Sequence, residues 1–385
     1  MRVLQRVLIR SVGGLLLWML IPAAPTALAD GGAPNLAYIG GSKTGISVID
    51  IRQQKVTTNF SLSGDPHTIY LSLDGRLLYV TQPALGRVIM LAAKTGQIVC
   101  TVNIPGQPSL LAFDPYSIML YAAGNGASSV TEFDPSNCTV KQTLQTSGPV
   151  YGLAVAITGS SSTSYQLWVS DPSGLEVFDH GKRIATIPIP GGPQYVSIPP
   201  GVSAYVTTQQ GNLYAVNLRT HRVSPPLLTG GQFGPMDYDA YTSQVYVPDR
   251  RNKQVDVLAP IITSTALFPR EPDRTIRVGA APQSVAITSD GQFGFIALAG
   301  GNVAMLDVPG REIINTIFVG GSPQFIITGL YPPVLDTTPQ QTTPRQVTIW
   351  STVINVIAYA LALALLIISI VFVARRARTT SAKKK

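Results

Sequence analysis

The chain has 385 residues, of which 12% are charged, and its 35 glycines and 30 prolines are spread along the sequence. This composition excludes a disordered chain and is typical of many short strands joined by tight turns. The formal net charge of +8 does not indicate nucleic-acid binding, because nine basic residues at the two ends account for the excess. Between those ends, 19 basic side chains are balanced by 20 acidic ones.

The first 29 residues are typical of a secretory signal peptide. A basic start, a short apolar stretch and an Ala-x-Ala motif follow one another at residues 2–10, 12–21 and 27–29. We expect cleavage of segment 1–29 before Asp30, because the apolar stretch is too short for a comfortable membrane span. An uncleaved membrane anchor is the alternative.

The C-terminal part contains three segments of distinct composition. Residues 331–346 are rich in Pro, Thr and Gln, which predicts an extended stalk. Residues 347–373 carry no charge, so we expect one transmembrane helix over residues 347–374, with a buried core helix as the alternative. The basic tail at residues 375–385 predicts a cytoplasmic C-terminus, which places the domain of residues 30–330 outside the plasma membrane.

The region between residues 30 and 330 is built from an internal repeat. Each unit begins at a Gly-x-Pro motif or a close variant of it, and successive landmark prolines are 41 to 47 residues apart. These prolines are Pro66, Pro108, Pro149, Pro193, Pro235, Pro282 and Pro323. A period in the forties with four short strands per unit is the signature of β-propeller blades. The strand-like alternation and the β-branched content exclude a solenoid of paired helices.

Two further strands can be recognised in each of the seven units. The third predicted strand usually ends in Asp or Asn, which suits a turn because a short polar side chain can bond its own backbone there. The second predicted strand opens with an aromatic residue, namely Tyr38, Tyr79, Tyr121, Trp168, Tyr205, Tyr246 or Phe295.

The two ends of the repeat predict how the ring closes. The first unit lacks its first strand, whereas residues 324–328 form a strand without a unit. We therefore predict an all-β, seven-bladed β-propeller in which the C-terminal strand completes the first blade and removes the open sheet edge.

The order Gly-x-Pro, apolar strand, Asp-Gly-Arg, Tyr-Val-Thr and Val-x-Val-Ile-Asp resembles the repeat of the YVTN-type β-propeller family. The resemblance covers about residues 35–330, is clearest at residues 64–106 and 279–320, and weakens in blades four to six. It implies an extracytoplasmic or periplasmic seven-bladed propeller. It implies no single activity, because propellers serve as lactonases, as haem- or quinone-linked enzymes and as binding modules.

The residue after each landmark proline begins an innermost strand and is expected near the mouth of the central channel. The candidate ligand-binding residues at these positions are His67, Ser109, Gln194, Met236, Gln283 and Gln324, and the seventh position is Val150. The alternative is that these side chains only solvate the channel or cap strand ends.

The residue types that metals and cofactors require are sparse. The three histidines, His67, His180 and His221, belong to different blades, and no CxxCH motif occurs, so we expect no metal and no cofactor. No Gly-x-Ser-x-Gly motif marks a nucleophile. Asp237 and Asp239, expected with Asp65 near channel-facing strand starts, are candidates for Ca²⁺ binding or acid–base chemistry, with solvated turn acids as the alternative.

The two cysteines, Cys100 and Cys138, fall in the outer parts of blades two and three. A disulfide needs Cα atoms within about 7 Å, and the outer strands of neighbouring blades diverge. The sequence therefore leaves the pairing open.

Basic residues gather in blade six. Arg250, Arg251 and Lys253 share one turn, and Arg270, Arg274 and Arg277 follow a Pro-rich insertion. This pattern suggests a partner surface for an anionic polysaccharide or lipid headgroup, with a solvated loop as the alternative.

Together these features predict a membrane-anchored, extracytoplasmic propeller that acts as a non-catalytic binding or scaffold module. Its expected partners are an unknown protein or glycan and, through residues 347–374, the lipid bilayer, but no nucleic acid. A lactonase-like or redox-associated enzyme and a cell-envelope adhesion protein are the alternatives.

Overall fold

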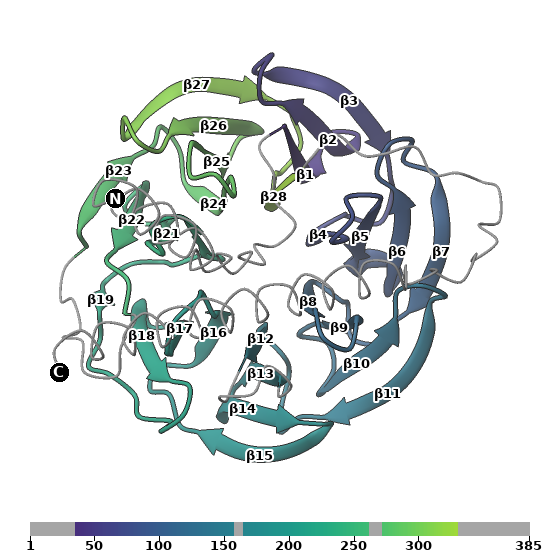
Figure 1. The fold of residues 1–385 in the computed structure, drawn as a ribbon, viewed down its shortest axis with the longest axis vertical. Coiled ribbons are helices and arrows are strands. Elements are labelled where there is room, and N and C mark those ends of the chain that lie inside the picture. Colours follow the sequence, from purple (N-terminus) through teal and green to yellow (C-terminus); the bar gives the residue numbers. More distant parts are fainter. Residues whose placement is uncertain (1–34, 158–164, 262–271, 330–385) are drawn as a thin grey trace, which may run out of the picture. The chain divides into compact units, whose positions relative to one another are not determined.

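The computed structural model describes residues 35–157, 165–261 and 272–329. These residues form seven antiparallel four-stranded sheets, which are arranged as blades around a central axis (Figure 1). The prediction of a seven-bladed propeller is therefore confirmed.

Each blade is described from its innermost to its outermost strand. Blade 1 holds β28 (Phe325–Gly329), β1 (Leu36–Ser42), β2 (Gly45–Asp50) and β3 (Lys55–Ser61). Blade 2 holds β4 (Ile69–Leu71), β5 (Leu77–Gln82), β6 (Arg87–Ala92) and β7 (Ile98–Asn103), with the short 3₁₀ helix η1 (Pro83–Leu85) between β5 and β6. Blade 3 holds β8 (Leu110–Asp114), β9 (Met119–Ala123), β10 (Ser129–Asp134) and β11 (Thr139–Gln145). Blade 4 holds β12 (Gly152–Ile157), β13 (Tyr165–Asp171), β14 (Gly174–Asp179) and β15 (Lys182–Ile187).

The remaining three blades follow the same order. Blade 5 holds β16 (Pro193–Ser197), β17 (Ser203–Thr208), β18 (Asn212–Asn217) and β19 (Leu228–Thr229). Blade 6 holds β20 (Asp237–Tyr238), β21 (Val245–Asp249), β22 (Gln254–Leu258) and β23 (Arg274–Arg277). Blade 7 holds β24 (Pro282–Ile287), β25 (Phe293–Leu298), β26 (Asn302–Asp307) and β27 (Glu312–Phe318). Blades 5 and 6 each contain a two-residue strand, which agrees with the weakened repeat in that part of the sequence.

Blade 1 closes the ring as predicted, because it joins the two ends of the described chain. The last strand, β28, pairs antiparallel with β1, and the register runs from Leu36 opposite Gly329 to Gly40 opposite Phe325. The open edge of β1 is thereby covered.

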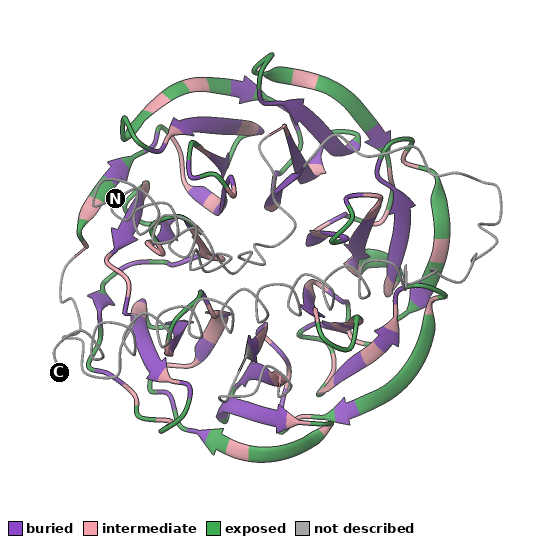
Figure 2. Ribbon diagram, in the orientation of Figure 1, coloured by how far each residue is buried: buried purple, intermediate pink, exposed green. Residues whose placement is uncertain are grey.

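Seven hydrophobic cores lie between adjacent blades, at what we call the seams. Inner strands are mostly buried and outer strands carry many exposed residues, as Figure 2 shows. Each seam core contains one of the seven aromatic residues of the second strands, namely Tyr38, Tyr79, Tyr121, Trp168, Tyr205, Tyr246 or Phe295. Six of these side chains are at most 5% exposed. The exception is Tyr121, which is only half-buried.

The alternating strand directions give the ring two different faces. The loops before the innermost strands and the turns between second and third strands lie on one face, which we call the proline face. The turns between first and second strands and between third and fourth strands lie on the other, which we call the aspartate face. Aspartate side chains accept hydrogen bonds from turn amides there, as Asp50 does from Gln53 (2.8 Å) and Asp134 from Ser136 (2.9 Å). The predicted role of Asp and Asn at the ends of third strands is thus confirmed in these turns.

Cys100 and Cys138 form a disulfide with a Cα–Cα distance of 6.2 Å. Cys100 lies on β7, the outermost strand of blade 2, and Cys138 lies in the turn before β11 of blade 3. Both pack against the core of the seam between these blades. The diverging outer strands do not prevent pairing, because the turn of blade 3 supplies the second cysteine.

The predicted signal peptide, stalk, transmembrane helix and basic tail lie outside the described residues. Within residues 35–157, 165–261 and 272–329, no helix is long and apolar enough to span a membrane.

Candidate functional site

The structure places the seven predicted channel positions within two residues of the start of an innermost strand on the proline face. Val150 is buried and Met236 partly buried, and both side chains pack into seam cores. The other five side chains are half-buried, namely those of His67, Ser109, Gln194, Gln283 and Gln324. We call these five residues the channel ring.

Backbone carbonyls of the channel ring are held by the preceding blade. The Thr68 hydroxyl donates to the carbonyl of Ser109 (2.6 Å), and the Ser170 hydroxyl donates to the carbonyl of Gln194. Gly152 permits this approach, because a Cβ there would lie 2.4 Å from the Gln194 carbonyl oxygen. The ring positions are therefore fixed by contacts between blades.

The side-chain amides of two ring glutamines bond their own loops. Gln194 donates through Nε2 to the carbonyl of Pro193 (3.3 Å), and Gln283 donates through Nε2 to the carbonyl of Ala281 (3.0 Å). These contacts support the strand-capping alternative for part of each side chain. The ring glutamines alone thus make a weak case for a ligand site.

Arg250 strengthens the case for a ligand site, because its side chain contacts the channel ring. The residue follows β21 in the turn to β22, which lies on the proline face. Its Nη2 donates to the carbonyl of Gln283 (3.4 Å), and its Nε is buried without a hydrogen-bond partner among the described residues. No carboxylate of the described residues forms a salt bridge with it. Arg250 therefore brings an unneutralised positive charge to the mouth.

His67 lies within the electrostatic influence of Arg250. Burial lowers the pKa of His67; the Asp65 charge and the hydrogen bond with the Ser109 backbone act in the opposite direction, and Arg250 lowers it further. Its Nδ1 lies 3.1 Å from the Thr68 hydroxyl oxygen. Residues of blades 2 and 6 thus act on each other electrostatically at the mouth.

The basic turn, defined as Arg250, Arg251 and Lys253, is part of the proline face. Arg251 donates through Nη1 to the carbonyl of Gly230 (3.0 Å), and Lys253 is exposed. Arg277 is exposed and pairs with Gln254, so it lies at the same end of blade 6.

Arg274 does not belong to this group, although Arg274 and Arg277 both follow the Pro-rich insertion in the sequence. It lies at the other end of β23, where it donates to Gln244 (2.7 Å) and to the Tyr246 hydroxyl (3.2 Å). Arg270 lies outside the described residues.

No carboxylate of the described residues forms an ion pair with the basic turn. Among the described turns of this face, the carboxylates are Asp65, Asp171 and Asp249. Asp171 and Asp249 are buried, and they accept hydrogen bonds from the amides of Ser173 (2.8 Å) and Gln232 (3.0 Å) respectively. Only Asp65 is exposed.

The expected pair Asp237 and Asp239 does not form a metal or acid–base site. Asp237 accepts a hydrogen bond from the Ile287 amide of blade 7 (2.7 Å). Asp239 is 1% exposed and accepts bonds from Tyr241 (2.8 Å) and Thr242 in a turn on the aspartate face, so it does not face the channel mouth. No group of three or more His, Cys, Asp or Glu suited to a metal ion occurs in the described part of the chain.

The fold resembles those of solved propellers. The β-propeller domain of Myceliophteria thermophila Cps50 (Swd1) matches with a TM-score of 0.59 and 12% identity, over 69% of this chain and 90% of that chain. Dihydro-heme d1 dehydrogenase NirN in complex with DHE matches with a TM-score of 0.56 and 15% identity, over 80% and 77% of the two chains. Apo AztD from Citrobacter koseri matches with a TM-score of 0.55 and 11% identity, over 76% and 97%.

These identities are low, so the likeness concerns the WD40-like propeller fold alone. No protein-family model matches the sequence, and the comparison with curated proteins gave no match.

Sequence reasoning found the ring positions but treated the basic turn as a separate surface. The repeat did indicate that the ring positions and the basic turn lie on the same face. Two antiparallel strands bring the chain back to its starting face, so the turn after the second strand must share the face of the Gly-x-Pro loop.

Proposed function

We propose that this chain is a membrane-anchored, extracytoplasmic propeller of the YVTN type that binds anionic groups of a protein or glycan partner at the channel mouth. The observation that carries the proposal is Arg250, whose charge lies beside the channel ring without a carboxylate partner among the described residues. A guanidinium in this state is suited to charge-assisted hydrogen bonds with carboxylate, sulfate or phosphate oxygens. The proposed role is non-catalytic binding, supported by the hydrogen-bond donors that Arg250, Gln194 and Gln283 bring to the mouth.

The location outside the cytoplasm is supported by the Cys100–Cys138 disulfide, because structural disulfides persist mainly in oxidising compartments.

The proposal is tested with the full chain in detergent micelles and with two polyanions, dextran sulfate as an acidic glycan and polyglutamate as an acidic protein surface. We expect saturable binding that weakens with salt, no binding of neutral dextran, and preference for one polyanion that identifies the partner class. Arg250→Gln should weaken binding about tenfold, the effect of losing a charge-assisted hydrogen bond.

Lys94→Gln is the matched control, because it removes the same charge from an exposed turn of the aspartate face. It should leave the affinity unchanged. Equal affinities of the native chain and the Arg250→Gln variant, or equal losses in both variants, would contradict the proposal.

A further inference from the structure

The seam between blades 3 and 4 holds a cavity of about 270 Å³ on the aspartate face. Its lining residues come from both blades, namely Asp114, Tyr116, Ser117, Tyr121, Glu132 and Gln142 of blade 3 and Tyr165, His180 and Gly181 of blade 4. This is the seam whose aromatic residue, Tyr121, is half-buried, whereas the other six are at most 5% exposed. The cavity therefore marks a departure from the packing that the other seams share.

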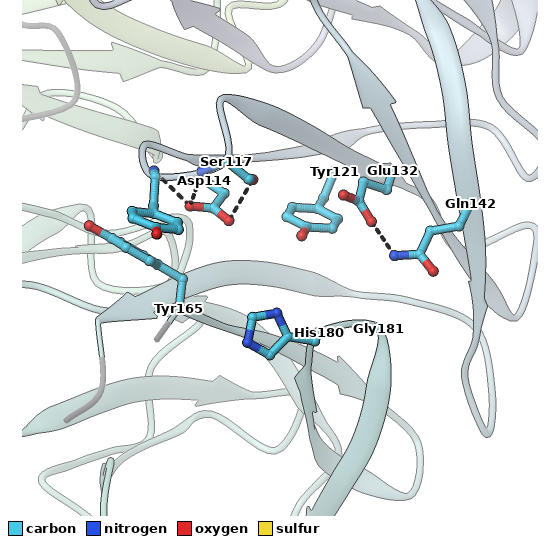
Figure 3. A pocket seen from close by; sticks show the side chains of 9 residues that line it. Asp114, Ser117, Tyr121, Glu132, Gln142, Tyr165, His180 and Gly181 are labelled. Atoms are coloured by element: carbon cyan, nitrogen blue, oxygen red, sulfur yellow. Dashed lines mark hydrogen bonds between the residues drawn. The ribbon is translucent and has the colours of Figure 1, made fainter. Parts of the chain in front are cut away.

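Aromatic rings form one side of the cavity. Tyr116 and Tyr165 stack across the seam with ring centroids 5.6 Å apart and an interplanar angle of 19°. Tyr116 is 58% exposed, so its ring contributes little to the core and remains accessible. Figure 3 shows Tyr165, with Tyr121 and His180 further along the cavity.

The charge inside the cavity is negative. Asp114 accepts bonds from the amide of Tyr116 (2.9 Å) and the hydroxyl of Ser117 (2.7 Å), and Glu132 accepts one from the Gln142 amide. Neither carboxylate forms a salt bridge with another described residue.

The carboxylates of Glu132 and Asp114 also affect the pKa of the Tyr121 hydroxyl. Its pKa is raised first by burial and then by the charges of Glu132 and Asp114, so the phenol stays protonated and neutral at physiological pH. The lining contains no Lys or Arg. The histidine of the lining, His180, is exposed and has its Nε2 3.6 Å from the Asp179 carboxylate.

We propose that this cavity binds the ammonium group of a small organic cation. Two carboxylates without ion-pair partners among the described residues provide the counter-charge, and the rings of Tyr116 and Tyr165, which line the cavity, provide the aromatic surface that attracts cations. The volume is close to the lower end of the range of ligand pockets, so the ligand is a short-chain amine or an amine-bearing side chain. The site differs from the channel mouth in face and in charge and does not depend on the proposed function.

The same ammonium chemistry can come from a free amine or from a lysine of a partner protein. Two pairs of probes separate these sources in calorimetric titrations of the full chain in detergent. The first pair is butylammonium and its neutral analogue 1-butanol. The second pair is a capped Ala-Ala-Lys-Ala-Ala peptide and the same peptide with norleucine in place of lysine. The proposal predicts that each cation binds at least about tenfold more tightly than its neutral partner. The cation that binds more tightly, butylammonium or the lysine peptide, identifies the source.

Variants locate the binding in the cavity. Glu132→Gln should weaken butylammonium binding about tenfold, and Tyr116→Leu should weaken it about threefold through loss of the aromatic face. Glu312→Gln is the matched control, because Glu312 is an exposed glutamate of the aspartate face in blade 7. Far-ultraviolet circular dichroism confirms that each variant is folded.

The proposal is overturned if 1-butanol binds as tightly as butylammonium, or if Glu132→Gln and Glu312→Gln behave alike. It is also overturned if neutral glucose binds more tightly than either cation, because the cavity would then be a sugar site.

Discussion

At the residue scale, His67 connects the chemistry of the mouth to the stability of the ring. Burial lowers its pKa, and the three groups that act on it come from its own loop, from blade 3 and from blade 6. The folded protein therefore holds this imidazole neutral at a pH where the unfolded chain, with an ordinary pKa near 6.5, begins to take up a proton. His67 is thus a reporter for the electrostatics of the site.

The first prediction concerns the pH dependence of stability. Because the pKa of His67 is lower in the folded state, the unfolded state binds more protons below about pH 6.5, and the free energy of unfolding falls as the pH falls. His67→Gln removes this contribution. The difference in Tm between pH 7.5 and pH 5 should shrink by about 2 °C in the variant.

Scanning calorimetry at the two pH values measures this difference, with His180→Gln as the control for an exposed histidine. An unchanged difference in the His67 variant would show that burial does not hold the imidazole neutral. An anion at the mouth would act in the opposite direction, since negative charge beside the ring raises the pKa of His67.

At the element scale, the disulfide links β7 of blade 2 to the turn before β11 of blade 3. It closes a segment with a sequence separation of 38 residues. Loss of such a link costs about 4 kcal/mol in the chain-entropy model. We predict that Cys100→Ser combined with Cys138→Ser lowers the Tm by about 10 °C.

Thermal melts with and without reductant measure this effect. Reductant should lower the Tm of the native chain toward that of the double variant and leave the variant itself unchanged. Equal melting of all samples would show that the seam core alone sets the stability of these two blades.

The elements also show which features a sequence can predict here. Strand order, blade number and ring closure were predictable, because the Gly-x-Pro loops and second-strand aromatics recur at nearly constant spacing. The disulfide was not, because it depends on how close the turn that carries Cys138 lies to Cys100 of the preceding blade. The cavity at Tyr121 was not predictable either, because the repeat gives that residue the same role as six buried aromatics.

The candidate site shows the same limit. The positions of the channel ring were predictable from the repeat. The hydrogen bond from Arg250 to the carbonyl of Gln283 in blade 7 was not, because it depends on the side-chain conformation of Arg250 and on the distance between two blades. The burial of Asp239, which removes it from consideration as a metal ligand, is likewise a tertiary property.

At the scale of the whole molecule, the ring depends on a single pairing between its ends. A chain that ends at Gly320 lacks β28 and leaves β1 with an open edge. We predict that this truncation lowers the Tm by more than 10 °C and increases aggregation, because an unpaired strand edge is a template for other chains.

The control is a chain that ends at Val334, the end of the compact unit. It keeps β28 and should melt within a few degrees of the full chain. Equal melting of the two truncated chains, followed by circular dichroism and light scattering, would contradict the closure mechanism.

The pairing of β28 with β1 also determines when the protein can finish folding. β1 is the first strand to be synthesised and β28 is the last, so blade 1 cannot be completed until the whole propeller sequence has left the ribosome. Blades 2 to 7 draw their four strands from contiguous sequence and can form one after another during synthesis. Until β28 is made, the edge of β1 stays unpaired and must be kept from pairing with other chains. The last step of folding is the pairing of β1 with β28, the two strands of the ring that are furthest apart in sequence.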